Sequence, residues 1–239
     1  MVPFAGYEMP VQYVGVREEH EAVRGTAGVF DVSHMGEIET VGPDALAFLQ
    51  RVLSNDVSKL QVGGAQYSVL CNETGGVIDD LFTYKLGEQR FLTVTNAANH
   101  DRDLAWFQKQ AADYDVELID RIDDFAMLAV QGPKAREIIS QLVEGPGPGW
   151  LEGDEGVDAE LPSRFRCKGL KIRGCSEAPL VCGTGYTGED GVELLIAPGD
   201  AVAAGSASPL CRFGCLKHRL VHQPESHCHR SSAHGQSPR

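Results

Sequence analysis

Two adjacent acidic residues, Asp79 and Asp80, follow the short segment GGVI at residues 75–78. Successive side chains of a strand point to opposite faces, so only one of the two can enter a given cavity. One interpretation is a solvated acid pair at the edge of a strand. The other is a carboxylate that stabilises a cationic or proton-releasing nitrogen of a ligand. The residue types alone leave both interpretations open.

Two further acids, Glu189 and Glu193, lie in the segment TGYTGEDGVEL at residues 184–194. Glu193 stands between the apolar residues Val192 and Leu194 of an expected strand, so one face of that strand carries a polar group. A carboxylate inside a pocket can bind an aminopyrimidine-type edge through two parallel hydrogen bonds. Each of these acids therefore has the same two interpretations, a solvated surface group or a ligand contact.

The run GTGYTG at residues 183–188 matches the G-x-G-x-x-G pattern of dinucleotide-binding proteins. That pattern binds a pyrophosphate when a helix follows, because the N-terminal N–H groups of the helix contact the phosphates. Here Asp190 and Gly191 are followed by a β-branched and apolar run, which predicts a turn into a strand. We therefore do not expect a nucleotide site.

The C-terminal residues 200–239 resemble a zinc cluster in residue type only. Their spacing fits no zinc-finger pattern, and no apolar scaffold separates the candidate ligands. We expect no metal site and an atypical, disordered tail, because the segment lacks a sustained helical or alternating pattern. The residues concerned are Cys211, Cys215, His218, His222, His227, Cys228, His229 and His234.

The composition of the 239 residues narrows the class of protein. Lys and Arg total 21 against 34 Asp and Glu, a formal net charge of −13, and residues 201–239 are locally basic. An acidic body repels a phosphate backbone, so nucleic acid is not an expected partner. No apolar run of about eighteen residues is present, so no membrane span is expected. An odd total of seven cysteines without a secretory signal favours reduced thiols and a cytoplasmic location.

Periodicity predicts helices inserted among antiparallel strands. Helical spacing is found at residues 16–24, 42–53, 99–112 and 131–143, and FDVSHMGEIETV at 30–41 alternates as an exposed strand would. Short turns join several strands, as in a meander. The expected fold class is α+β, with antiparallel sheets and packed helices. The other strands are expected near residues 65–71, 77–86, 90–95, 116–119, 126–130, 170–172, 179–182 and 192–196.

Seven segments occur in an order that closely resembles the aminomethyltransferase, or T-protein, family of the glycine cleavage system, over residues 1–199. They are FAGYEMPVQY (4–13), AVRGTAGVFDVSHMGE (22–37), SNDVSKL (54–60), YSVLCNETGGVIDDL (67–81), VTNAAN (94–99), AVQGPKA (129–135) and TGYTGEDGVEL (184–194).

The resemblance implies an enzyme that moves the aminomethyl carbon from the lipoyl arm of the H-protein to tetrahydrofolate and releases ammonia. Orientation and an acid that offsets developing positive charge should supply most of the catalysis. Asp80 matches the family carboxylate beside the reacting folate nitrogens, and Glu193 matches the acid that binds the pterin edge. Positions that match the lining of the folate cavity are Tyr67, Tyr84, Val94, Asn96 and Tyr186.

The resemblance also predicts the domain organisation. Residues 36–121 are expected to form an inserted α+β domain, and residues 1–35 with 122–199 a discontinuous folate-binding domain. A short leading segment of the family pattern is expected to be absent. Beyond residue 199 the family continues with a folate-contacting arginine and a third domain, so we expect a truncated chain with weakened folate binding. The strand at 192–196 should then present an unpaired edge, with an open cavity wall behind Glu193.

Two alternatives within the same superfamily remain. One is a non-catalytic folate-binding protein, although that branch carries a cysteine-containing motif where this chain has TGYTGEDGVE at residues 184–193. The other is the folate domain of a flavin-linked demethylase, which the segment FDVSHMGE at residues 30–37 does not exclude.

Overall fold

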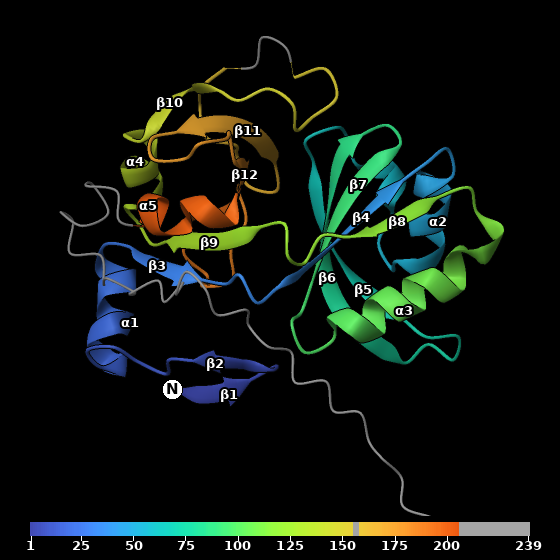
Figure 1. Cartoon of the computed structure of the whole chain (residues 1–239), viewed down its shortest axis with the longest axis horizontal. Coiled ribbons are helices and arrows are strands. Elements are labelled where there is room, and N and C mark those ends of the chain that lie inside the picture. Colours follow the sequence, from blue (N-terminus) through green and yellow to red (C-terminus); the bar gives the residue numbers. More distant parts are fainter. Residues whose placement is uncertain (155–157, 206–239) are drawn as a thin grey trace, which may run out of the picture.

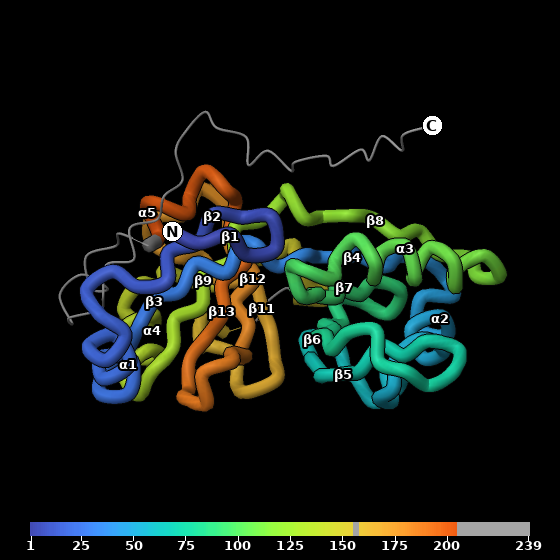
Figure 2. Tube along the Cα trace, turned by 90° about the horizontal axis from the view of Figure 1, so that it is seen from below, coloured from blue at the N-terminus to red at the C-terminus, as the bar shows by residue number. Residues whose placement is uncertain are grey.

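The computed structural model describes residues 1–154 and 158–205, which fold into two lobes, each built on one antiparallel sheet (Figure 1). The strand order is β5-β6-β7-β4-β8 in the first sheet and β10-β11-β12-β13-β9-β3 in the second. Figure 2 shows the lobes side by side from a second direction, with the chain passing between them twice. The expected α+β class with antiparallel sheets is confirmed.

The five-stranded sheet is covered on one face by two helices. The apolar sides of α2 and α3 bury Phe48 and Phe107, whose rings meet edge to face at 5.5 Å. Ile38 and Leu70 complete that core from the sheet. The elements are β4 (Gly36–Val41), α2 (Ala45–Val52), η1 (Val57–Lys59), β5 (Ala65–Cys71), β6 (Val77–Gly87), β7 (Arg90–Thr95), α3 (His100–Gln110), η2 (Ala111–Asp113) and β8 (Glu117–Asp120).

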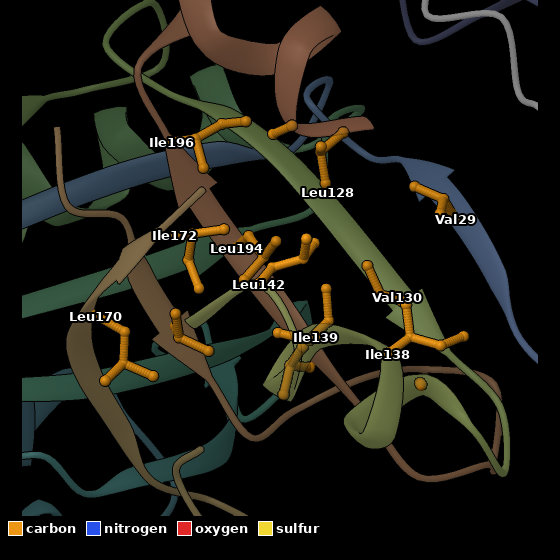
Figure 3. Close-up of a cluster of buried hydrophobic side chains, with 14 of the residues drawn as sticks. Val29, Leu128, Val130, Ile138, Ile139, Leu142, Leu170, Ile172, Leu194 and Ile196 are labelled. Carbon is orange, nitrogen blue, oxygen red and sulfur yellow. The ribbon is translucent and has the colours of Figure 1, made fainter. Parts of the chain in front are cut away.

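The six-stranded sheet has its own core under two short helices. Ile138 and Ile139 of α4 pack on Val130, Leu194 and their neighbours, as Figure 3 shows. The elements are α1 (Val16–Gly25), β3 (Gly28–Asp31), β9 (Ala126–Gln131), α4 (Ala135–Ser140), β10 (Val143–Pro146), β11 (Cys167–Ile172), β12 (Leu180–Cys182), β13 (Gly191–Ile196), η3 (Pro198–Asp200) and α5 (Ala201–Gly205).

A third apolar cluster joins the lobes. Tyr84 and Leu92 come from the five-stranded sheet, whereas Met127, Cys182 and Leu195 come from the six-stranded sheet. Because side chains alternate along β13, the residue two positions before Leu195 also points toward the other lobe. The alternation thus turns the carboxyl side chain at position 193 toward the boundary between the lobes.

A hairpin of β1 (Val2–Phe4) and β2 (Tyr7–Met9) precedes α1. It packs by aromatic contacts, with the rings of Phe4 and Tyr7 at 5.7 and 6.2 Å from that of His34. Such short strands carry almost no periodicity, so the pattern could not reveal them.

Three expectations about strands and helices are wrong. The segment 30–41 does not form one exposed strand, because it contributes to β3 and to β4, which belong to different sheets. The helix expected to reach residue 143 ends at Ser140, since Val143 begins β10 and pairs with Ile172. The strand at 192–196 has no free edge, because β13 lies between β12 and β9 and pairs with β9 over six residues.

The tail expected from residue 200 does not begin at that residue. Residues 201–205 form α5, and Ala201 and Ala204 are buried in the core of the six-stranded lobe. The Cys- and His-rich segment and the rest of the predicted tail lie outside the described residues. Within the described part of the chain, no helix has the length and apolar character needed to span a membrane.

Candidate functional site

Asp80 receives hydrogen bonds from tyrosines of both lobes. The phenol of Tyr67, from β5, donates to Asp80 Oδ2 at 2.6 Å. The phenol of Tyr186, from the loop before β13, donates to the same oxygen at 3.2 Å. Among the described residues, Asp80 Oδ1 has only a long contact of 3.5 Å, with Asn96 Nδ2. The structure therefore brings four of the predicted site residues together at the boundary between the lobes.

Both phenols stay protonated donors toward this carboxylate. The hydrogen bond to Asp80 raises the pKa of Tyr67, and the negative charge of Asp80 raises the pKa of Tyr186. Tyr67 is 43% exposed and Tyr186 is 83% exposed, so solvent reaches this side of Asp80. A ligand that carries an N–H group could replace either phenol without opening the core.

An aromatic wall that sequence reasoning missed stands beside Asp80. The ring of Phe82 lies 5.9 Å from that of Tyr67 and 5.9 Å from that of Phe165, on which it stacks at 19°. The guanidinium of Arg164 lies over the ring of Phe165 at 5.0 Å. Phe165 adopts a φ of 60°, in the left-handed region that bulky residues avoid. Strained backbone of this kind is found at ligand-binding sites more often than elsewhere.

Asp79 is not a solvated member of an acid pair, because it is only 4% exposed. Its carboxylate accepts hydrogen bonds from the side chain of Asn99 at 2.6 Å and from the side chain and backbone N–H of Asn96 at 3.0 and 3.2 Å. Burial alone would raise the pKa of Asp79, but the hydrogen bonds from Asp103, Asn96 and Asn99 outweigh it and lower the pKa. Asp79 thus stabilises the structure on the face of β6 opposite Asp80.

Asn96 connects the two acids. Besides its bond to Asp79, its Nδ2 donates to the backbone carbonyl of Asp80 at 2.9 Å. These two bonds use both amide hydrogens and fix the carboxamide plane against β6. Asn96 therefore lies next to Asp80, and its predicted place in the lining of a folate cavity stays a prediction.

A second polar group is buried deeper between the lobes. The hydroxyl of Thr184 donates to Glu193 Oε2, and the Tyr84 hydroxyl lies 2.9 Å from Thr184 Oγ1. Since the proton of Thr184 is used toward Glu193, Tyr84 must donate to Thr184. Burial raises the pKa of Glu193, while the hydrogen bond from Thr184 opposes that shift. Thr184 was not predicted, although it is the second residue of the GTGYTG run.

The glycines of this run have a packing role. A Cβ on Gly183 would lie 2.1 Å from the carbonyl oxygen of Ser163, and one on Gly185 would lie 1.9 Å from Oε1 of Gln131. Gln131 is fully buried and donates to the carbonyls of Thr184 and Val192 at 3.2 and 3.3 Å. The strand β13, and not a helix N-terminus, directly follows the loop, as expected. The dinucleotide interpretation is therefore excluded.

The remaining predicted residues have different surroundings. Val94 and Tyr84 are 4% and 1% exposed and pack in the cluster between the lobes, where Val94 pairs with Phe82 in the β6–β7 ladder. Glu189 forms an ion pair with Arg24 at 2.8 Å on the surface. Of its two interpretations, the geometry favours the surface group.

The described residues contain a cavity of about 440 Å³ away from Asp80, between α3 and the β5–β6 hairpin. It is lined in part by Val77, Arg102 and Trp106 and by none of the predicted site residues. In the described ranges, no group of three or more His, Cys, Asp or Glu side chains could hold a metal ion.

Comparison with known proteins supports the resemblance seen in the segments. The GCVT N-terminal domain family matches residues 1–206. This chain belongs to that family. It is 47% identical over 201 residues to the aminomethyltransferase of Bacillus subtilis (strain 168), covering 84% of this chain and 52% of the relative. An aminomethyltransferase of Thermus thermophilus is 48% identical over 201 residues, covering 84% and 54%.

Solved structures agree with the fold. The glycine cleavage system aminomethyltransferase T of Bartonella henselae matches with a TM-score of 0.68 and 33% identity, over 89% of this chain and 52% of that one. The heterotetrameric sarcosine oxidase of Corynebacterium sp. U-96 matches with a TM-score of 0.52 over 79% of this chain and 86% of that one. At 13% identity the second match concerns the fold alone. The chain spans about half the length of the curated relatives it matches.

Proposed function

We propose that this chain is the folate-binding part of a tetrahydrofolate-dependent aminomethyltransferase of glycine cleavage. The reaction moves the aminomethyl carbon from the lipoyl arm of the H-protein to tetrahydrofolate and releases ammonia. The observation that carries the proposal is the position of Asp80 between the lobes, with phenols from both lobes on one oxygen and the other oxygen weakly engaged. The names of relatives at 46–48% identity support it.

Asp80 has the role of a charge-stabilising group in this proposal. Transfer to a folate nitrogen develops positive charge there, and a fixed carboxylate lowers the energy of that charge. The hydrogen bond from Tyr67 holds Oδ2 in place, so Oδ1 can approach the nitrogen without reorganisation. The exposed Tyr186 would swing away or stay as a second donor when the ligand enters.

Glu193 has the role of binding the pterin edge. Its carboxylate is partly buried and accepts a hydrogen bond from Thr184, which in turn is hydrogen-bonded to Tyr84. Two parallel N–H donors of an aminopyrimidine match the two oxygens of an ionised carboxylate. Val94 and the aromatic wall of Phe82 and Phe165 supply apolar contacts for the rings.

The finer parts of the proposal concern partners and organisation. Residues 36–121 form the inserted domain, and residues 1–35 with 122–199 form the discontinuous one. The lipoylated H-protein is the protein partner, and a net charge of −13 disfavours nucleic acid. We place the protein in the cytoplasm; free thiols, such as those of Cys167 and Cys182 on the adjacent strands β11 and β12, suit a reducing compartment.

Calorimetric titration of the chain with tetrahydrofolate tests the proposal. We expect one saturable site in the wild type and an affinity about tenfold to a hundredfold lower in Glu193→Gln, since one charged hydrogen-bonding partner is lost. The matched control is Glu189→Gln, on the surface, which should bind as the wild type does. Absence of binding in the wild type, or equal weakening in both variants, would contradict the proposal.

A further inference from the structure

Asp103 is a buried acid that the site described above does not use. It lies four residues after Asn99, the N-cap residue of α3, so both side chains lie on one side of the helix. That face lies toward β6, where Asn99 and Asp103 contact Asp79. The sequence therefore brings an amide and a carboxyl group to Asp79, the acid of β6 that points away from the boundary between the lobes.

The hydrogen bonds around the two acids show where a proton must be. Asp103 is fully buried, and within the described residues no N–H or hydroxyl group donates to either of its carboxyl oxygens. Asp79 already accepts three hydrogen bonds from Asn96 and Asn99. Two ionised carboxylates in contact repel each other, and their contact is a hydrogen bond only if one of them is protonated. The hydrogen bonds that Asp79 accepts stabilise its ionised form, whereas Asp103 accepts none from the described residues. The proton therefore belongs to Asp103, whose carboxyl group donates it in a hydrogen bond to Asp79.

The electrostatic setting agrees with this assignment. Burial, followed by the hydrogen bond to Asp79 and the charge of Asp79, raises the pKa of Asp103 to about 8, and the charge of Arg102 acts in the opposite direction. The charged groups that act on this carboxyl come from β6 and from α3 itself. Asp103 is thus neutral at pH 7 and loses its proton in mildly alkaline solution.

We propose that Asp79 and Asp103 form a proton-sharing acid pair that positions Asn96 beside Asp80. The pair fixes Asn96 because Asp79 takes one hydrogen of Nδ2 and the backbone N–H, while the carbonyl of Asp80 takes the other hydrogen. The amide oxygen of Asn96 is then turned away from β6, and no described residue donates to it. This oxygen is held ready to accept an N–H group of a ligand.

The inference rests on the proposed function for its ligand, but the acid pair itself can be tested without one. Thermal unfolding of the unliganded chain is followed against pH for the wild type, Asp103→Asn and the exposed control Asp113→Asn. A folded-state pKa raised above the unfolded value contributes stability that is fully present below the unfolded pKa of about 4, declines as pH rises, and is lost once pH has passed about 8. The amide introduced by Asp103→Asn cannot ionise, yet it can still donate to Asp79.

The melting temperature of the wild type should therefore fall relative to that of Asp103→Asn as pH rises from about 4 to about 8, the difference should level off above about 8, and Asp113→Asn should follow the wild type. Parallel profiles for all three proteins would overturn the proton-sharing pair. Glu37 and Glu193, which also titrate above their usual range, cancel in this difference because every variant retains them.

The positioning role is tested by titration with tetrahydrofolate on both sides of pH 8. We expect the affinity of the wild type to fall about fivefold on the alkaline side, the loss expected from one weakened hydrogen bond, and that of Asp103→Asn to stay constant. If the unfolding profiles diverge but the affinities change alike, the pair exists and its positioning role is wrong. If tetrahydrofolate binds to no variant at either pH, the proposed function fails, while the unfolding profiles still decide on the pair.

Discussion

The two faces of β6 carry the same side chain in opposite settings. On the face toward α3, Asp79 is 4% exposed and accepts three hydrogen bonds from two asparagines, with Asp103 in contact. On the face toward the other lobe, Asp80 is half-buried and bonded through one oxygen to two exposed phenols. A saturated carboxylate contributes to stability, whereas a carboxylate with spare capacity can bind a ligand. Adjacent residues of identical chemistry are thus assigned different roles by their surroundings.

The largest effect should come from Asp80→Asn, measured as turnover in this chain joined to the C-terminal half of the aminomethyltransferase of Bacillus subtilis. Removal of the charge with retention of shape should lower turnover by roughly a hundredfold or more. The melting temperature should barely change, because Asp80 is solvent-accessible. Turnover within about threefold of the unsubstituted enzyme would refute the assignment of Asp80.

Asp79→Asn should show the reverse pattern. An amide at this buried position would direct N–H groups at the donors of Asn96 and Asn99, so we expect a loss of about 1–3 kcal/mol in the free energy of unfolding. Urea titration of the unliganded chain measures it. Turnover should fall less than in Asp80→Asn at a temperature where both are folded. Equal losses of turnover in the two variants would remove the distinction between the faces.

The pH dependence of folate affinity should separate Glu193 from Asp80. Burial raises the pKa of Glu193, and the ligand's N–H groups require the ionised carboxylate. Affinity should therefore fall as pH drops through that raised pKa, by at most about tenfold per pH unit. The affinity of Glu193→Gln should lack this pH dependence. If the pH profile of this variant is the same as that of the wild type, Glu193 does not contact the ligand.

The smallest effect is expected where an acid is paired at the surface. Arg24→Gln breaks the ion pair with Glu189. The side chain of Arg24 is 45% exposed and that of Glu189 is 26% exposed. Solvent screening limits such a pair to about 0.2–1 kcal/mol of folding free energy, and folate affinity should not change. A loss of affinity in Arg24→Gln would mean that Glu189 belongs to the site after all.

The sequence predicted local elements well and long-range pairing poorly. The strand at Ala65–Cys71 was predicted with its observed limits, because its periodicity is local. The partners of β13 are residues 126–131 and 180–182, which periodicity cannot select, and the expected free edge was therefore wrong. Asp103 and Asn99 were missed because their role depends on which face of β6 the helix α3 covers. The positive φ of Phe165 has no signal in the sequence.

Some site residues could be predicted from the sequence and others could not. The positions of Asp80, Tyr67, Tyr186 and Asn96 followed from the resemblance, and the structure brings them together. Thr184 could have been noticed in the sequence. It is a hydroxyl residue between Gly183 and Gly185, which have no side chains that would block its approach to a nearby acid such as Glu193. The burial of Asp79 could not, since two adjacent acids in a strand do not reveal which of them faces the core.

The central claim is that tetrahydrofolate binds between the lobes with its reacting nitrogens at Asp80 and its pterin edge at Glu193. A crystal structure of the chain with bound tetrahydrofolate tests it most directly. We predict a folate nitrogen within about 3 Å of an oxygen of Asp80, paired aminopyrimidine hydrogen bonds to Glu193, and at least one of the two phenols displaced from Asp80. A ligand bound in the cavity between α3 and the β5–β6 hairpin, with both phenols still on Asp80, would contradict the claim.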